Sequence, residues 1–181
     1  MGKVDRACAL ARSLLAEPLP RRWAHTQGVA ATARRLTDVL GEQAELIEAA
    51  AWLHDIGYSP ALVETGLHAL DGARYLRDVA RAEPMLCGLV AYHTGAIYEA
   101  QERGLESQLL DEFDPPPTEL SKALTYCDIT TSPDGHDIDV RERLDDVLRR
   151  YGPDDPVHRT IRKARDFYLA SVRDIEARLA S

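Results

Sequence analysis

The sequence predicts an all-α protein folded as one compact multi-helix bundle. Apolar residues recur at steps of three and four along most of the chain, the spacing that lines one face of a helix. No segment between turn residues alternates apolar and polar side chains as a half-buried strand would. The chain has 181 residues, of which 45% are hydrophobic and 29% charged, so it is long enough and apolar enough to fold without disulfides.

Prolines separate the first two predicted helices. The first covers about residues 3–16 and ends before Pro18, because proline cannot continue a helix. The second begins near Arg21 and places apolar side chains on one stripe. His25 lies on that stripe, one turn before Val29, so an imidazole is expected on the side of the helix that faces the core.

The third predicted helix ends with two adjacent ionisable residues. It covers about residues 42–56, and His54 and Asp55 fall on its last turn. Gly57 is expected to end this helix in the left-handed conformation that glycine adopts readily. A carboxylate is unfavourable at the negative end of a helix dipole, so the position of Asp55 favours a metal ion as its partner.

Two further helices each place a histidine near one end. One begins near His68. The other begins with Pro84, a residue suited to the first helical turn, and brings His93 to its end before Gly95.

The remaining elements follow a stiff connection. Three consecutive prolines at 115–117 are not compatible with a helix, and Thr118 is the expected N-cap of the helix that carries Asp128. Apolar residues at 157–179 repeat at three- and four-residue steps, which predicts a packing helix that carries no chemistry.

Four histidines and two acids in apolar helical contexts together indicate a metal site. They are His25, His54, Asp55, His68, His93 and Asp128. A buried carboxylate is costly without a compensating charge, and imidazole and carboxylate groups bind iron, manganese, cobalt, nickel or zinc. Their spacing is long and irregular, so it does not by itself bring them together. The other two histidines, His136 and His158, lie in polar contexts and are expected to be exposed.

The order H...HD...H...H...D resembles the HD-domain phosphohydrolase superfamily. "WAHTQGVAATARRL" resembles the family's first histidine helix, "AAAWLHDIGY" its namesake motif and "YCDITTS" its closing aspartate. "GLHALDGARYL" and "VAYHTGA" resemble dinuclear members, in particular the bacterial proteins that symmetrically hydrolyse diadenosine tetraphosphate. The resemblance implies a single HD domain over residues 1–181, with a motif-bearing core at about 21–132 and packing helices at about 139–180.

The resemblance also implies a role for each of the six residues. One or two divalent transition metals are expected, with two favoured. The ligands implied for the first ion are His25, His54 and Asp128, and those implied for the second are His68 and His93. Asp55 would bridge the ions, and Asp55 and His54 are the implied catalytic residues.

The expected function is metal-dependent hydrolysis of a nucleotide or related small phosphoester. Bound cations lower the pKa of a water, orient the resulting hydroxide and neutralise charge on a phosphoryl oxygen. Arg22 lies three residues before His25, on about the same helix face, where it is a candidate to hold a substrate phosphate. Comparable basic candidates are Arg21, Arg74 and Lys122.

Two alternative functions use the same residues. Some HD-domain relatives use a similar ligand set as di-iron oxygenases, and the sequence does not separate this chemistry from hydrolysis. A non-catalytic HD module that binds a nucleotide or a partner protein is the third hypothesis, which the six intact positions disfavour.

Composition excludes several other classes. The three cysteines, Cys8, Cys87 and Cys127, are scattered, so neither a disulfide framework nor a thiolate zinc site is expected. No apolar run is long enough to span a bilayer. The net charge of −8 opposes binding to a nucleic-acid backbone. We therefore expect a cytoplasmic protein whose partner is a small phosphorylated substrate, with no nucleic acid and no membrane; the sequence predicts no oligomeric state.

Overall fold

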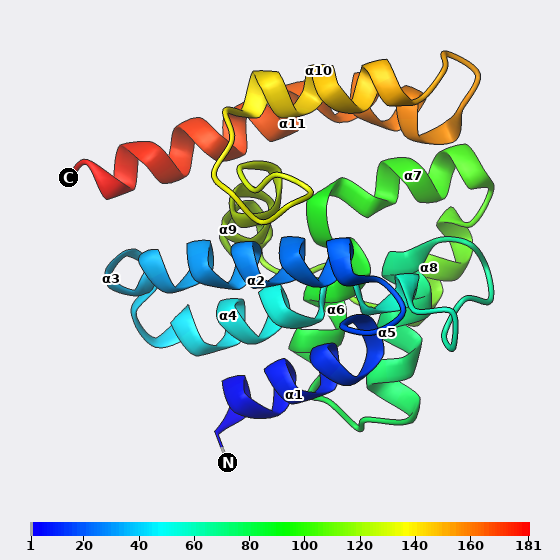
Figure 1. Ribbon diagram of the computed structural model, residues 1–181, viewed down its shortest axis with the longest axis horizontal. Helices are drawn as coiled ribbons and strands as arrows, with labels where there is room; N and C mark the ends of the chain where they lie inside the picture. The colour runs from blue at the N-terminus through cyan, green and yellow to red at the C-terminus, as the bar shows by residue number, and fades with distance from the viewer. Residues whose placement is uncertain (1) are drawn as a thin grey trace.

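Helices form the regular structure of residues 2–181, which the computed structural model describes (Figure 1), and the all-α prediction is confirmed. The α-helices are α1 (Lys3–Leu15), α2 (Pro20–Arg35), α3 (Thr37–Leu40), α4 (Ala44–Leu53), α5 (His68–Asp78), α6 (Pro84–Tyr92), α7 (Ala96–Arg103), α8 (Glu106–Glu112), α9 (Thr118–Ile129), α10 (Val140–Arg150) and α11 (Pro156–Leu179). Short 3-10 helices are η1 (Gly41–Gln43), η2 (Ile56–Tyr58) and η3 (His93–Gly95). No helix in this part of the chain is long and apolar enough to cross a membrane.

The helices are arranged as a core with a C-terminal pair laid across it. Helix α4 packs between α1 and α2 and also contacts α6 and α9, so it is surrounded by apolar neighbours. In Figure 1, α10 and α11 lie together along one side of the bundle, above α9 and α7. A second apolar cluster joins this pair to the end of α9 and includes Ile129, Leu144, Ile161 and Tyr168. Helices α10 and α11 therefore cover one side of the bundle centre; the division of the chain into an HD core and C-terminal packing helices stays a prediction.

The His54–Asp55 pair lies just beyond α4 rather than on its last turn. The α-helix ends at Leu53, His54 is its C-cap, and the chain continues into η2. Gly57 lies outside the positive-φ region, so the expected left-handed glycine is wrong. Glycine is needed for a different reason: a Cβ atom at this position would lie 1.9 Å from the carbonyl oxygen of His68. The start of α5 packs directly against the Gly57 backbone, which holds His68 next to the His54–Asp55 pair.

Helix α9 begins one residue earlier than its predicted cap implies. Pro117 is the N-cap residue, with φ −52° and ψ 138°, and Thr118 is already helical. The prediction of Thr118 as N-cap is wrong because the extended Pro117 itself turns the chain into the helix. No side chain caps this end, and α9 carries Asp128 in its last turn, where it lies close to His25 and His54.

Candidate metal centre

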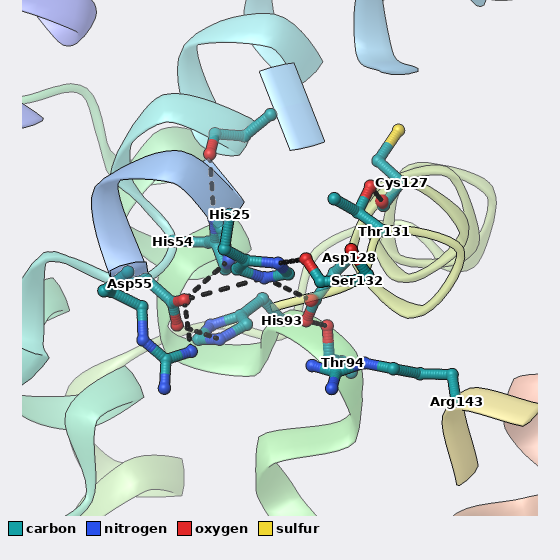
Figure 2. A network of polar contacts seen from close by, with 12 residues as sticks. His25, His54, Asp55, His93, Thr94, Cys127, Asp128, Thr131, Ser132 and Arg143 are labelled. Carbon is teal, nitrogen blue, oxygen red and sulfur yellow. Dashed lines mark hydrogen bonds and ion pairs between the residues drawn. The ribbon is translucent and has the colours of Figure 1, made fainter. Parts of the chain in front are cut away.

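All six predicted ligands meet at the centre of the bundle, and Figure 2 shows five of them. They come from α2, the segment after α4, the start of α5, the segment after α6, and α9. The six residues form two groups, within each of which one ligand atom per residue lies within 4.8 Å of the others. The first group is His25, His54 and Asp128, and the second is Asp55, His68 and His93. The fold therefore brings together residues as far apart in sequence as His25 and Asp128.

Asp55 lies between the two groups and turns one carboxylate oxygen toward each. Its Oδ2 is 3.2 Å from Nε2 of His54 and 3.8 Å from Nε2 of His25. Its Oδ1 is 3.5 Å from Nε2 of His68 and 4.0 Å from Nε2 of His93. This division of the two oxygens is what a carboxylate shared between two cations requires, and the bridging role stays a prediction.

Backbone carbonyls set the orientation of three histidine rings. In each ring Nδ1 donates to a carbonyl oxygen, which only accepts, so Nδ1 carries the proton. The acceptors are the carbonyls of Ala51 for His54 (2.8 Å), Val90 for His93 (2.6 Å) and Ser132 for His25 (3.0 Å). In the neutral rings Nε2 is then unprotonated and faces the centre. Metal-binding histidines are commonly held by this kind of outer hydrogen bond.

The unprotonated Nε2 atoms need a cation. Nε2 of His25 lies 2.9 Å from Oδ1 of Asp128, so in the neutral ring two lone pairs face each other. Nε2 of His54 is buried and makes no hydrogen bond. Acceptor atoms held this close are unfavourable unless a proton or a metal ion lies between them. The residues present therefore fit a divalent metal ion.

Electrostatics lead to the same conclusion. Burial alone would lower the pKa of His54, but the carboxylates of Asp55 and Asp128 outweigh it and raise this pKa to about 9. A centre that attracts a proton so strongly into a buried ring also attracts a metal cation. Burial lowers the pKa of both His68 and His93, so these rings are neutral at pH 7, the state in which a ring nitrogen binds metal.

A family model described as HD domain matches residues 22–130, more than half of the 181-residue chain. The chain belongs to the HD-domain family. HD domains are mostly metal-dependent hydrolases that bind divalent metals, and the two His/Asp groups are residues that can hold such ions. The comparisons with curated proteins and with solved structures found no match. The particular similarity to diadenosine tetraphosphate hydrolases stays a prediction.

One close backbone contact and one set of hydrogen bonds support the segments that carry ligands of this HD domain. A Cβ atom at Gly28 would lie 2.4 Å from the carbonyl oxygen of Gly135, so the loop after α9 packs directly on α2 and brings the Ser132 carbonyl to His25. On the other side, the carboxylate of Asp71 accepts hydrogen bonds from the backbone of the loop that leads into α5. The donors are the N–H groups of Glu64, Thr65 and Gly66.

Thr94 orients Asp128 and was not indicated by the sequence. Its hydroxyl donates to Oδ2 of Asp128 at 2.5 Å, which leaves Oδ1 facing His25. Thr94 has φ 48° and ψ 39°, a left-handed conformation that is strained for a β-branched residue. The hydroxyl of Tyr168 in α11 donates to the Thr94 carbonyl oxygen at 3.1 Å. Backbone strain of this kind has no sequence signature. Helix α11 was predicted to carry no chemistry, but its Tyr168 helps to hold Thr94 in this conformation.

Arg22 lies at the edge of the centre, and the other basic candidates do not. Nη1 of Arg22 donates to Oδ2 of Asp55 at 2.8 Å. Its guanidinium lies over the Tyr58 ring, which in turn stacks on His68 with ring centroids 4.0 Å apart. The other candidates pair with acids away from the ligands: Arg21 with Asp134, Arg74 with Glu112 and Lys122 with Asp174. Substrate binding by Arg22 stays a prediction.

Single-ligand variants should separate the two groups of the HD domain. We expect His25→Ala and His93→Ala each to lower the metal content from about two ions per chain toward about one, because each removes a ligand from one group only. Metal content is measured by mass spectrometry after loading and desalting. His136 is exposed and outside both groups, so His136→Ala is the matched control and should retain both ions. Wild-type metal content in both ligand variants would contradict a two-ion centre.

Proposed function

We propose that this HD protein hydrolyses a nucleotide or a related small phosphoester in a metal-dependent reaction. The observation that carries the proposal is Asp55, whose two oxygens face two groups of metal-binding side chains beside a pocket that three arginines line. A shared carboxylate between two ions supports phosphoryl chemistry, in which charge develops on several oxygens of one group.

The pocket next to the ligands is lined by metal-binding residues and by arginines. The ligand residues that line it are Asp55, His68, His93 and Asp128, and the arginines are Arg22, Arg143 and Arg150. Guanidinium groups donate paired hydrogen bonds that match phosphate geometry. A phosphate in this pocket would lie near both the metal-binding residues and the arginines, which supports an anionic substrate.

The residues of the chain divide the work of such a reaction. Divalent ions held by the two groups would supply Lewis acidity at a phosphoryl oxygen and a water of lowered pKa. Asp55 is fixed by the hydrogen bond from Arg22, so its lone pairs keep their directions. Burial would raise the pKa of Asp55, but Arg22 and His54 hold it well below the usual range, so the carboxylate stays ionised. Arg22 also places a positive charge where a bound phosphate would enter.

A substrate screen tests the proposal. The protein is loaded anaerobically with Mn²⁺, Fe²⁺, Co²⁺ or Ni²⁺ and incubated with nucleoside phosphates, dinucleoside polyphosphates and simple phosphomonoesters. We expect phosphate or nucleotide release with at least one metal, and its loss after treatment with a chelator. Absence of turnover with every metal, in protein shown to contain metal, would contradict the proposal. Substrate-dependent oxygen uptake would instead support the di-iron oxygenase.

A further inference from the structure

Arg143 in α10 is a largely buried cation, and two of its nitrogens have no hydrogen-bond partner in the part of the chain that the structure describes. Its side chain is 11% exposed, and both Nε and Nη1 are buried and make no hydrogen bond within the described residues. Oδ2 of Asp146 lies 4.0 Å from Nη1, at the limit of an ion pair. Burial lowers the pKa of Arg143, which reflects a charge removed from water without full compensation. Buried guanidinium donors are normally satisfied, so this arrangement points to a missing anion.

The side chain of Arg143 is directed toward the metal-binding residues. Figure 2 shows it extending from α10 toward Thr94 and Asp128, and it lines the same pocket as Asp55. The donors of Arg143 therefore face the space next to the centre.

The neighbouring arginines already have acidic partners. Arg22 is bonded to Asp55, and Nη2 of Arg150 lies 2.9 Å from Oδ2 of Asp146. Asp146 is the acid that lies near both arginines, and it is closer to Arg150 than to Arg143. The lining of the pocket has three arginines and three acids, Asp55, Glu99 and Asp128, and no hydrogen bond joins Arg143 to any of these acids within the described residues. Arg143 is therefore the arginine whose charge is least compensated.

A second pocket adjoins the first at the same three arginines. It has a volume of about 330 Å³, and its lining includes Pro18, Leu19, Pro20 and Pro133 together with Arg22, Arg143 and Arg150. A ligand that occupies both pockets would have its anionic group at the arginines and a less polar group along the prolines.

We propose that Arg143 anchors a phosphate of an organic phosphate ligand whose remaining part lies in the proline-lined pocket. The proposal rests on the proposed function for the statement that the bound ligand is hydrolysed. The anion-binding site itself is argued from the unsatisfied donors of Arg143. Arg143 lies outside residues 22–130, the segment matched by the HD-domain family model. Recognition of the ligand is therefore assigned to α10, a helix added to the HD core.

Replacing Arg143 with methionine separates anion binding from a structural role. Methionine keeps much of the length and removes the charge. We expect the dissociation constant for inorganic phosphate, measured by calorimetry on metal-loaded and on chelator-treated protein, to rise about ten-fold or more. Tm should stay the same or rise, because an unpaired buried charge is removed. A wild-type phosphate affinity, or a large fall in Tm with unchanged affinity, would overturn the proposal.

Arg149→Met is the matched control for this substitution. Arg149 lies in the same helix, but its side chain is 70% exposed and does not line either pocket, so phosphate affinity should be unchanged. If Arg143→Met does not fold, Arg143→Lys replaces it; lysine lacks the paired donors, and a several-fold loss of phosphate affinity is expected. Wild-type affinity in Arg143→Lys would then overturn the proposal.

Adenosine monophosphate tests the organic part of the ligand. It should bind at least about ten-fold more tightly than inorganic phosphate if the proline-lined pocket accepts its nucleoside. Equal affinity would overturn this part of the proposal. Lost phosphate binding in Arg143→Met without any hydrolysis by the wild type would uphold the anion site and refute the proposed function. Hydrolysis by the wild type, together with wild-type phosphate binding by Arg143→Met, would uphold the proposed function and refute the anion site.

Discussion

Asp55→Asn is expected to reduce phosphohydrolase activity by about 10³-fold, equivalent to about 4 kcal/mol of transition-state stabilisation. Asparagine has nearly the shape of aspartate but no charge. Because the two oxygens of Asp55 face different groups of ligands, one substitution weakens cation binding in both groups. The metal content should fall together with the activity. Turnover is measured at saturating metal, and bound metal is measured in the same preparation.

Folding must be intact for the Asp55 result to be informative. Arg22 loses its charged partner in this variant, so far-UV circular dichroism and Tm are recorded alongside activity. Asp78→Asn is the matched control, because Asp78 is a surface acid that also pairs with an arginine, Arg77, and neither residue lines the pockets beside the centre, so it should keep wild-type activity. Full turnover and full metal content in Asp55→Asn would exclude Asp55 from the centre.

Gly57→Ala should destabilise the protein and displace a predicted metal ligand. The added Cβ atom would lie 1.9 Å from the His68 carbonyl oxygen and 2.7 Å from the backbone nitrogen of Gly72. Backbone atoms of α5 cannot rotate away, so the whole helix start must shift, and His68 with it. We expect a loss of about 3 kcal/mol in the free energy of unfolding, at the upper end for overpacking. For a chain of this size that corresponds to a Tm lower by roughly 6–12 °C.

Gly152→Ala provides the comparison for Gly57→Ala. A Cβ atom at Gly152 meets no atom within 4 Å and requires no unusual backbone conformation, so Tm should change little. Calorimetric melting of both variants, with metal content measured before heating, checks the expected order. An unchanged Tm in Gly57→Ala would show that the contact between Gly57 and α5 is not as tight as described.

Much of the fold could be predicted from sequence because helices are set by local patterns. The start of α6 at Pro84 and the start of α5 near His68 follow from proline chemistry and apolar spacing within a few residues. The errors at Gly57 and Thr118 have a shared cause. At both positions a local capping rule was applied where a different contact decides: α5 against Gly57, and the extended Pro117 before Thr118.

The candidate site was likewise predictable from the sequence only in part. All six predicted ligands converge, although neither their spacing nor their apolar surroundings specify the convergence, and the family resemblance was needed to expect it. Thr94, Tyr168 and Arg143 were not predicted. A strained threonine, a tyrosine that supports it and one arginine among many have no distinguishing local pattern.

Residue order alone was sufficient for the helical class, the list of metal-binding candidates and the family they resemble, because these depend on residue type and short-range periodicity. Which oxygen of Asp55 faces which histidines, and which arginine is left without an anion, depends on atoms from helices far apart in the chain. The Asp55 distances arise when α2, α5 and α6 pack around α4 and η2, whereas the position of Arg143 arises when α10 packs on α11 and α11 packs on α9. The packing of the C-terminal pair therefore decides which side chains from α10 and α11 line the pocket beside the HD centre.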